Sequence, residues 1–533
     1  MGVLSLLTIP ELSVAIPVFL IAVVMVFVIQ ALMDRSQSFP GPFRLPLVGN
    51  IPQLGKRTHE SLKRLSDTYG DVMTIWLGGH KAIVLSSIDA MKDCFLGQAV
   101  TFSGRPHFDS FDHALESGVT PIAVKTLCPG QRFQRKTLRE GIVKFVNDRD
   151  CPISPMIESE AEELITRLME KTRDGLDPVN PADEFYMTAT AVIYRLAYGE
   201  FDRSNIGDFA THLEYTRNLV KWVGTSKIGD LFPWTQPFFR GQLTEFLKAR
   251  DTYKAIVHKK INRHFEEFDE NNIRDIMDDI IRVMHNTTPD QMDALEHKDP
   301  DMIWMSLALV AAGTETTGSS LNWVLVYLLK HSEHLKKVHA EIDDVIGRDR
   351  NPTADDRKKL PYLDACILEA LRLCPPIPLA IPHAATTDVE YRGKKIPKGC
   401  IVFSNIYAIH RNPQTWKNPD VYDPTRFLNA DGEVIIAKQE MVVPFGLGMR
   451  RCLGETLARA ELFVIIATLL QKFDVTVAPG SEVNLVGDVG LTVWPKPYQV
   501  MLSRRQSEPL YNSFALSLVI ENLRSFPVIG HCN

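Results

Sequence analysis

The sequence predicts a mainly α-helical protein with small β-sheets near both ends of a large globular body. Of its 533 residues, 45% are hydrophobic and 23% are charged, a balance typical of folded chains. A long apolar-rich stretch with helical character begins at Asp299-Pro300 and runs to about His331. Short β-rich runs separated by glycine lie on either side of the helical region. Together these observations indicate an α+β protein dominated by helices.

Composition also excludes several function classes. The net charge of -6 argues against a nucleic-acid partner, because nucleic-acid-binding domains are usually basic. Eight cysteines in a chain of this length are too few for a disulfide scaffold. No C-x-x-C pair or zinc-type histidine spacing is present.

The N-terminal segment, residues 1–33, is predicted to be a membrane anchor. Leu12 to Met33 is uncharged and mostly apolar, and a helix over these residues would be about 33 Å long, enough to cross a bilayer core. Positive residues such as Arg35 and Arg44 occur only after this run, which places the body in the cytosol. A cleaved signal peptide is the alternative, but no basic residue precedes the run and no small-x-small cleavage site follows.

The segments around the body have distinct compositions. Residues 34–55 contain Pro40-Gly41-Pro42, Pro46 and Pro52, which favour a stiff linker that orients the body against the membrane. Residues 56–505 form the predicted catalytic domain. Residues 506–533 are a C-terminal extension to which the sequence assigns no role.

Local patterns predict the elements of the body in order. Val72–Leu77 and Lys81–Leu85 flank Gly78-Gly79 and predict a hairpin. Helical patterns dominate from about Asp109 to Lys260. Within them, the apolar loop Leu231–Phe239 fits core packing and a membrane or substrate-access role equally well.

Further elements are predicted along the C-terminal half. Helices are expected after the long apolar helix, at Ser332–Val345 and Pro361–Cys374, the latter opened and closed by proline. Strands are expected at Val389–Tyr391, Lys395–Phe403 and Tyr498–Leu502.

Cys452 lies in the segment most indicative of chemistry. Glu455 through Leu470 predicts a helix, so the thiol sits just before a helix N-terminus, where positive partial charge favours a thiolate. Gly448 and Gly454 let the backbone pass close to a flat ligand and offer N–H groups to sulfur. Phe445 can exclude water and Arg450 can bind a carboxylate. This pattern predicts a thiolate metal ligand, the alternative being a buried structural cysteine.

This segment resembles the haem-binding signature of the cytochrome P-450 family, F-x-x-G-x-R-x-C-x-G, at all five fixed positions. The resemblance extends over roughly Phe39 to Arg504 and is strongest to animal microsomal members, especially steroid 17α-hydroxylases and aryl-hydrocarbon-oxidising enzymes. It implies the cytochrome P-450 fold behind a single transmembrane helix in the endoplasmic reticulum membrane. It also implies haem b as cofactor, Cys452 as the axial ligand of its iron and Arg450 as a propionate ligand.

The long helix carries a second matching segment, Ala312 to Thr317, which resembles the family's A-G-x-[DE]-T-[TS] motif. Gly313 is expected to leave room over a bound ligand. An acid followed by an alcohol can relay protons, so Glu315 and Thr316 are the predicted catalytic pair. A threonine-rich buried helix face is the alternative.

Two further motifs are expected to support the haem site. Glu369 and Arg372 lie at i and i+3 on one helix face, and Asp423–Phe427 resembles the family's P-x-R-F element. The resemblance implies a buried ion network of Glu369, Arg372 and Arg426 that braces the cysteine loop. His383 corresponds to a family position that contacts a haem propionate, with a strand-edge polar residue as the alternative.

One segment departs from the family pattern. A W-x-x-x-R helix usually holds a propionate, but the matching stretch, Gly130–Thr137, has Phe133 for tryptophan and Thr137 for arginine. Lys136 or Arg132 is the predicted substitute. The same region contributes to a basic face that would suit an acidic reductase, or would simply be solvated; its residues are Arg132, Arg135, Lys136, Arg139, Lys438, Arg450, Arg451 and Arg459.

The activity implied by the resemblance is insertion of one atom of O2, the co-substrate, into a hydrophobic small molecule that is steroid-like or planar aromatic. Electrons would come from NADPH through a flavoprotein reductase, with cytochrome b5 as a second candidate donor. The alternatives are a haem-thiolate isomerase or dehydratase that works without O2, and a non-catalytic membrane protein that binds haem or a ligand. The predicted substrate pocket comprises Phe108, Phe111, Ala312, Gly313, Ile377 and Leu379.

Overall fold

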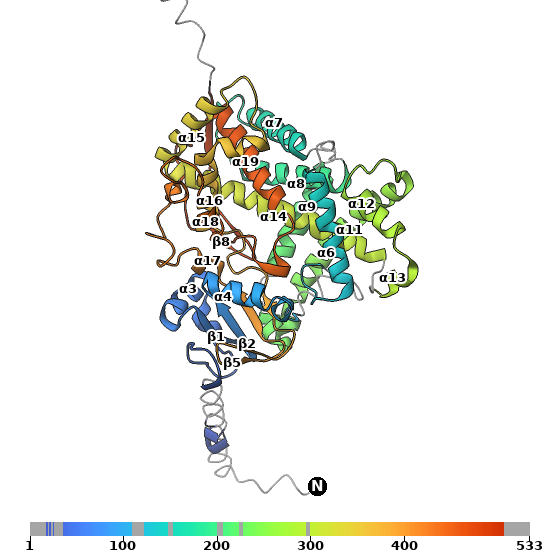
Figure 1. Cartoon of the computed structure of the whole chain (residues 1–533), viewed down its shortest axis with the longest axis vertical. Coiled ribbons are helices and arrows are strands. Elements are labelled where there is room, and N and C mark those ends of the chain that lie inside the picture. The colour runs from blue at the N-terminus through green and yellow to red at the C-terminus, as the bar shows by residue number, and fades with distance from the viewer. Residues whose placement is uncertain are drawn as a thin grey trace, which may run out of the picture.

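The computed structural model describes residues 17–19, 21–22, 25, 36–108, 122–147, 153–199, 206–222, 228–294 and 299–505. Most of the molecule is helical and small sheets complete it, which confirms the predicted fold class (Figure 1). The predicted membrane anchor lies mostly outside the described residues, and residues 506–533 lie entirely outside them. Among the described helices, none combines the length and apolarity needed to span a bilayer.

A four-stranded sheet forms one end of the molecule (Figure 1). The predicted hairpin is confirmed: β1 (Val72–Leu77) pairs antiparallel with β2 (His80–Leu85) around Gly78-Gly79. β6 (Ile401–Ser404) then pairs parallel to β2, and β3 (His383–Ala384) pairs antiparallel to β6. The sheet therefore holds His383 in the same layer as the N-terminal hairpin, with β6 between them.

The predicted strand Lys395–Phe403 is wrong as a single element. It divides into β5 (Lys394–Ile396), which pairs with β4 (Val389–Tyr391), and β6, which joins the larger sheet. The break falls at Pro397-Lys398-Gly399, where proline lacks a ladder N–H and Gly399 has a φ of 79°.

The proline-rich segment lies along β1. The backbone N–H of Thr74 donates to Pro40 at 3.0 Å, and the Asn50 N–H donates to Trp76 at 2.6 Å. A Cβ on Gly41 would lie 2.0 Å from the Thr74 carbonyl oxygen, so only glycine permits this approach. Residues 40–50 therefore dock against the body.

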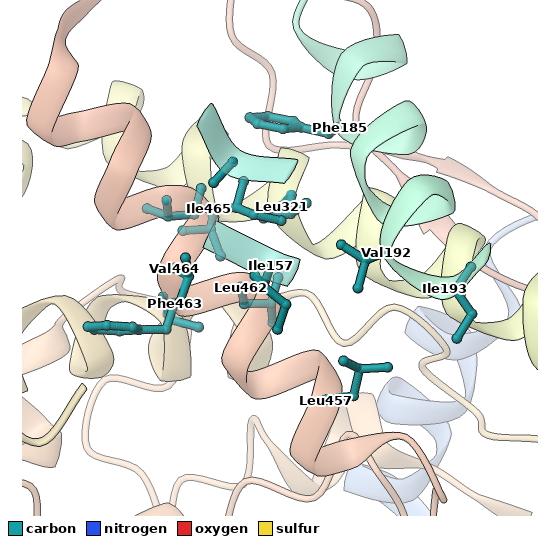
Figure 2. Close-up of a cluster of buried hydrophobic side chains, with 14 of the residues drawn as sticks. Ile157, Phe185, Val192, Ile193, Leu321, Leu457, Leu462, Phe463, Val464 and Ile465 are labelled. Atoms are coloured by element: carbon teal, nitrogen blue, oxygen red, sulfur yellow. The ribbon is translucent and has the colours of Figure 1, made fainter. Parts of the chain in front are cut away.

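The long helix α14 (Asp299–Lys330) is the centre of the helical part. It packs against α8 (Ala182–Tyr198), α16 (Pro361–Leu373), α19 (Glu455–Lys472) and α11 (Arg240–Glu267). Figure 2 shows Leu321 of α14 and Leu462 of α19 meeting Ile157 of α7 (Ile153–Lys171) in the apolar core between these helices. This packing fixes α14 relative to the loop that precedes α19.

The remaining elements complete the body. Helices not yet given are α2 (Ile51–Leu54), α3 (Thr58–Tyr69), α4 (Ile88–Lys92), η1 (Asp93–Gly97), η2 (Thr101–Ser103), α6 (Pro129–Asn147), α9 (Ile206–Trp222), α10 (Ile228–Leu231), η3 (Pro233–Phe239), α12 (Ile276–His285), α13 (Pro289–Ala294), α15 (Ser332–Val345), η4 (Ala354–Lys359), α17 (Ile406–Ile409), η5 (Pro424–Phe427), α18 (Ile436–Gln439) and η6 (Gly448–Arg450). The remaining strands form two small antiparallel pairs, β7 (Phe473–Val477) with β10 (Val500–Arg504) and β8 (Asp488–Val489) with β9 (Val493–Trp494).

Candidate functional site

A cavity of about 310 Å³ lies between the middle of α14, the start of α19 and the loop that carries Cys452. Cys452 lines it from the loop side. On the α14 side the wall carries the apolar Ala308, Leu309 and Ala312, followed along the helix by Thr316, Thr317 and Ser320. The cavity is therefore lined by a thiol and by a helix face that is apolar in its first part and carries hydroxyl groups in its second.

Backbone contacts hold the loop before α19. The Cys452 N–H donates to the Phe445 carbonyl at 2.8 Å, and both residues line the cavity. Gly448 has a φ of 71°, and a Cβ there would lie 2.0 Å from the Phe95 carbonyl oxygen. A side chain at position 448 would thus collide with the backbone of Phe95, so only glycine fits there. A Cβ on Gly454 would meet no atom within 4 Å, and that residue lines the cavity.

The electrostatics of Cys452 differ from the expectation. Burial raises the pKa of its thiol, and a hydrogen bond from the Gly454 N–H, together with the nearby Arg135 and Arg451, only partly opposes this. Burial thus opposes the thiolate that the helix N-terminus is expected to favour. A bound metal cation would add compensating positive charge, since metal coordination deprotonates a thiol outright.

Three arginines converge on the same cavity: Arg105, Arg135 and Arg450. Arg105 donates to the carbonyls of Ala123, Ile381 and Pro382 at 2.8–2.9 Å. Within the described part of the chain, no ion pair joins any of the three to a carboxylate.

Burial lowers the pKa of all three guanidinium groups, that of Arg450 to about 10. The charge of Arg135 adds to this effect at Arg105 and Arg450, and the charge of Arg139 adds to it at Arg135. Such a cluster of cations is completed by an anionic ligand. Haem, with two propionates and a flat ring, fits this site. Cys452 would hold its iron, and the three arginines would hold its propionates.

Helix α6 shows which basic residue takes the place of the arginine that the W-x-x-x-R pattern would supply. Arg135 lines the cavity, whereas Arg132 and Lys136 are exposed and line a separate groove. The structure thus turns the predicted substitutes away from the cavity. Arg135 shares its helix face with Leu138 and Ile142, which also line the cavity, because these positions are three and seven residues apart.

His383 also lines the cavity, from β3. Its Nδ1 lies 2.7 Å from the Phe102 carbonyl, so Nδ1 carries a proton, and its ring stacks on Phe95. Burial beside Arg105 and Arg450 holds the pKa of His383 well below 6.5. In the neutral ring Nε2 is then an acceptor, so donation to a propionate would require the imidazolium form.

The two predicted catalytic residues of α14 face different surroundings. Thr316 lines the cavity, and its hydroxyl donates to the Ala312 carbonyl at 2.8 Å. Glu315 is not among the residues that line the cavity. Its Oε1 accepts a hydrogen bond from Thr492 at 2.8 Å, and burial raises its pKa.

Gly313 lines the cavity, but the space freed by its missing side chain faces α8. A Cβ there would lie 2.9 Å from Ile193. The expectation that this glycine makes room for a ligand is therefore incomplete, because it primarily permits helix packing.

The other predicted pocket residues separate into two groups. Ala312 and Ile377 line the cavity. Phe108 and Leu379 are buried instead in the apolar cluster beside the four-stranded sheet, and Phe111 lies outside the described residues.

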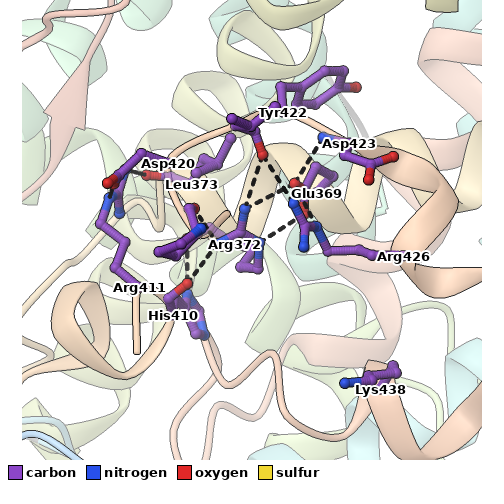
Figure 3. Close-up of polar contacts among 12 residues, drawn as sticks. Glu369, Arg372, Leu373, His410, Arg411, Asp420, Tyr422, Asp423, Arg426 and Lys438 are labelled. Atoms are coloured by element: carbon purple, nitrogen blue, oxygen red, sulfur yellow. Dashed lines mark hydrogen bonds and ion pairs between the residues drawn. The ribbon is translucent and has the colours of Figure 1, made fainter. Parts of the chain in front are cut away.

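A buried ion network stands behind the cysteine loop (Figure 3). Arg372 Nε donates to Glu369 Oε2 at 2.7 Å, and Arg426 Nε donates to Glu369 Oε1 at 3.0 Å. The Arg372 and Glu369 side chains are both 0% exposed. The structure thus brings together the three residues expected to brace the loop.

His410 connects this network to the loop. Its Nδ1 donates to the Arg372 carbonyl at 3.0 Å, and its Nε2 accepts from the Val443 N–H at 2.8 Å. Val443 immediately precedes the segment Pro444–Leu447 that lines the cavity. Burial lowers the pKa of His410 to about 3, so the imidazole is neutral and its two ring nitrogens keep these roles.

A second groove, of about 740 Å³, lies on the outer side of the cysteine loop. Seven of its lining residues are basic and Glu455 is its one acid among the described residues. Glu455 is already paired with Arg451 at 2.7 Å and Arg459 at 3.1 Å. We call this groove the basic surface; its cations are Arg132, Arg135, Lys136, Arg139, Arg357, Arg451 and Arg459. Of the predicted basic face, Arg450 instead faces the cavity, and Lys438 lies over Trp416.

Sequence reasoning missed three residues of this site: Arg105, His410 and Glu461, the last a cavity-lining acid of α19. It assigned Arg135 to the basic face but not to the cavity, which this residue also lines. Helical spacing with Leu138 and Ile142 could have identified Arg135. Nothing local marks Arg105 or His410, because their partners lie far away in the sequence.

Comparisons with known proteins agree with this geometry. The family model for cytochrome P450 matches residues 39–502. The chain is 32% identical to cytochrome P450 1A1 of Macaca mulatta over 460 residues, which is 85% of this chain and 90% of that protein. It is 33% identical to cytochrome P450 1A2 of Oryctolagus cuniculus over 464 residues, 85% of this chain and 89% of that protein. The chain therefore belongs to the cytochrome P450 family, and it is a haem-dependent monooxygenase that uses O2.

Proposed function

We propose that this protein oxidises a hydrophobic small molecule, steroid-like or planar aromatic, in the cavity between α14 and Cys452. The observation that carries the proposal is a cavity lined by a thiol, by apolar residues of α14 and by three arginines that form no ion pair with a carboxylate among the described residues. Among the described lining residues, the wall formed by Ile193, Ala308, Leu309, Ala312, Ile377 and Ala380 offers no charged group to a substrate. Such a wall fits a rigid apolar molecule.

The chain's own residues have separate tasks in this reaction. When bound, haem supplies the iron at which O2 is activated. Cys452 would hold that iron, and Arg105, Arg135 and Arg450 would bind and orient the propionates. The Thr316 hydroxyl, which faces the cavity, can reorient from the Ala312 carbonyl to hold a proton or a water beside the substrate. Phe445 and Leu447 exclude bulk water from the sulfur side.

The proposed electron donor is an NADPH-dependent flavoprotein reductase, with cytochrome b5 as a second donor, docking on the basic surface. Cys452 and Leu453 line this surface as well as the cavity, so a partner docked there would contact the loop that carries the sulfur. Its excess of positive charge suits an acidic partner and makes association sensitive to salt.

The proposed location is the endoplasmic reticulum membrane, with residues 12–33 as a single-pass anchor and the body in the cytosol. Support comes from an apolar surface on the described body. Trp234 is 74% exposed and Phe238 is 81% exposed on η3, and Leu47 is 85% exposed. These segments are neighbours, because Gly78 lies next to the Phe232 ring and its N–H donates to the Val48 carbonyl. Aromatic and apolar side chains at one surface favour contact with lipid.

The experiment is the reduced, carbon monoxide difference spectrum of the protein beside Cys452→Ser, followed by oxygen uptake with NADPH and a reductase. We expect a thiolate-type band that is lost in the variant, and NADPH-dependent oxygen uptake stimulated by planar aromatic or steroid probes. An imidazole-type band would overturn the assignment of Cys452. A thiolate band without oxygen uptake, but with turnover of a peroxide, would favour the isomerase or dehydratase class. Ligand-induced spectral shifts without any turnover would favour a non-catalytic binding protein.

A further inference from the structure

The basic surface is a hollow with cations on both of its walls. One wall is formed by α6, and the other by the start of α19 and the loop before it. Its volume of about 740 Å³ is of the size of small-molecule sites in proteins. A hollow lined by charges of one sign also concentrates ions of the opposite sign. The groove therefore has both the room and the field for a small anionic ligand.

Three cations on the α6 wall have no counter-charge within the described structure. Arg132, Lys136 and Arg139 are exposed, line the groove and form no ion pair there. The one acid among the described lining residues, Glu455, is already shared by two arginines. The positive charge of the α6 wall is thus left for a ligand from outside the chain to neutralise.

The spacing of these cations indicates how the anionic groups of the ligand are arranged. Positions 132, 136 and 139 lie on one helix face, and the helix axis rises by about 10 Å from the first to the last. A single phosphate group is too small to reach all three. The first two residues of α19, Glu455 and Thr456, also line the groove, and the first turn of a helix favours anions through its unpaired N–H groups. The ligand that fits carries several phosphate groups.

A buried oxygen in the same groove lacks a donor. Gln131 lines the groove and is 0% exposed. Its Nε2 donates to the Ile122 carbonyl at 3.0 Å, whereas its Oε1 has no hydrogen-bond partner within the described structure. An ionised phosphate oxygen only accepts hydrogen bonds, so it leaves this atom unsatisfied, but a hydroxyl group can donate to it. The ligand that satisfies Gln131 therefore carries a free hydroxyl group beside its phosphates.

We propose that the basic surface binds a small polyphosphorylated molecule with free hydroxyl groups, and that the bound molecule excludes the reductase from this surface. Nucleoside triphosphates and inositol phosphates share this chemistry. Binding requires only the folded haem protein, whereas the exclusion of the reductase rests on the electron donor proposed above. Electron supply to the enzyme would then fall as the concentration of the ligand rises.

The first test is isothermal titration calorimetry of the full-length haem protein in detergent. The probes are ATP, inositol 1,4,5-trisphosphate and inorganic triphosphate at one ionic strength without Mg²⁺. We expect ATP or the inositol trisphosphate to bind about fivefold or more tightly than inorganic triphosphate, because only these two can donate a hydroxyl hydrogen bond to Gln131. The tighter of the two identifies the source of the phosphates. Binding of inorganic triphosphate as tight as that of both others, or no binding of any probe, would overturn the proposal.

Exposed lysines and arginines supply the variants for this titration. Lys136→Gln combined with Arg139→Gln removes two of the unpaired cations and should weaken binding about tenfold or more. The matched control, Lys336→Gln combined with Lys337→Gln, removes two exposed cations of α15 and should leave the affinity unchanged. Equal weakening in both would show attraction to the overall charge of the protein and would overturn the site. Gln131→Leu should abolish the preference for hydroxyl-bearing probes, and a preference that persists would contradict the role of its oxygen.

The second test measures association of a flavoprotein reductase with the immobilised native protein by surface plasmon resonance. The tighter-binding probe is added at ten times its own Kd, against sodium chloride of matched ionic strength. We expect the apparent Kd for the reductase to rise about tenfold, as for two ligands that share one site. Unchanged association despite calorimetric binding would overturn the exclusion of the reductase. A native protein that accepts no electrons from the reductase would instead contradict the proposed function and leave the calorimetric result standing.

Discussion

Two buried polar networks lie on opposite sides of the site, and one consists of charged groups whereas the other consists of neutral groups. Behind the cysteine loop, Glu369, Arg372 and Arg426 form a charged network that His410 joins to Val443. On the far side of α14, the Thr314 hydroxyl meets Thr190 of α8 at 3.1 Å and His212 of α9 at 2.9 Å. All three residues of this second network are 0% exposed.

The networks differ in charge and in completeness. Burial lowers the pKa of His212 to about 3, so the second network is neutral, and His212 Nδ1 has no partner within the described structure. Removing one member of a buried ion pair costs about 3–5 kcal/mol, whereas losing a neutral hydrogen bond costs about 1–3 kcal/mol. The loop that holds the metal ligand is thus braced more strongly than the helices on the opposite side of α14.

The largest predicted effect comes from breaking the charged network. Glu369→Gln leaves Arg372 and Arg426 buried without a counter-charge, and we expect the free energy of unfolding to fall by about 3–5 kcal/mol. The carbon monoxide difference spectrum should lose its thiolate-type band, because the loop that carries Cys452 is no longer fixed. Urea denaturation followed by circular dichroism measures the first effect.

A matched comparison is Glu60→Gln, which removes a carboxylate that is 31% exposed and whose one ion pair among the described residues is with Arg57, at 2.8 Å. Surface pairs contribute little, so this variant should keep both stability and spectrum. Equal losses in the two variants would contradict the bracing role of the charged network.

The next effect concerns the cluster of Arg105, Arg135 and Arg450. Removing one of these arginines should raise the stability of the haem-free protein and weaken the binding of haem. Arg135→Gln removes repulsion against Arg450 and Arg105, so the haem-free protein should become slightly more stable. The haem-bound protein should lose a charged contact of about 1.5–3 kcal/mol, which accelerates haem transfer to an acceptor protein about tenfold or more. Arg132→Gln, on the outer side of the same helix, is the control and should leave haem transfer unchanged.

These networks also show what the sequence could reveal. Cys452, Glu369 and Arg372 lie in short motifs whose spacing carries their geometry, and the structure brings each of them to its expected place. Arg105 and His410 act through backbone carbonyl and N–H groups of distant segments, which no local pattern encodes.

The fold was predictable for a similar reason. The bounds of α14, α15 and α16 agree with the expected helices because proline, glycine and periodicity mark them locally. The pairing of β2 with β6, like the location of Phe108 in the sheet cluster, depends on contacts between remote segments. Tertiary packing of this kind decides which apolar residues line the cavity and which are buried in the core.

A smaller effect is expected from the neutral network. Thr314→Val keeps the shape of the side chain but leaves Thr190 and His212 without their common partner, which should cost about 1–3 kcal/mol of unfolding free energy. The thiolate-type band should be retained, because no hydrogen bond of this network reaches the cysteine loop within the described structure. Loss of that band in Thr314→Val would show that the two networks are coupled and that the two sides of α14 are not braced independently.

The smallest effect depends on pH and comes from a single ion pair between α11 and the N-terminus of α12. His264 Nε2 lies 2.9 Å from Asp275 Oδ2, and its Nδ1 lies 2.8 Å from the Lys260 carbonyl. Burial acts to lower the pKa of His264, but the hydrogen bond and charge of Asp275 outweigh it, so the pKa is raised above 6.5. The folded protein therefore holds this proton more tightly than the unfolded chain does.

The stabilisation from this pair should be complete below the unfolded pKa of about 6.5 and should vanish as pH rises through the higher folded pKa. Urea denaturation of the native protein and His264→Gln between about pH 6 and pH 9 measures it, and the difference between them should shrink as pH rises. A difference that grows with pH would mean that folding favours the neutral ring. In that case the pair would behave like the neutral network around His212. The presence of charged partners would then no longer predict which buried network contributes more to the free energy of unfolding.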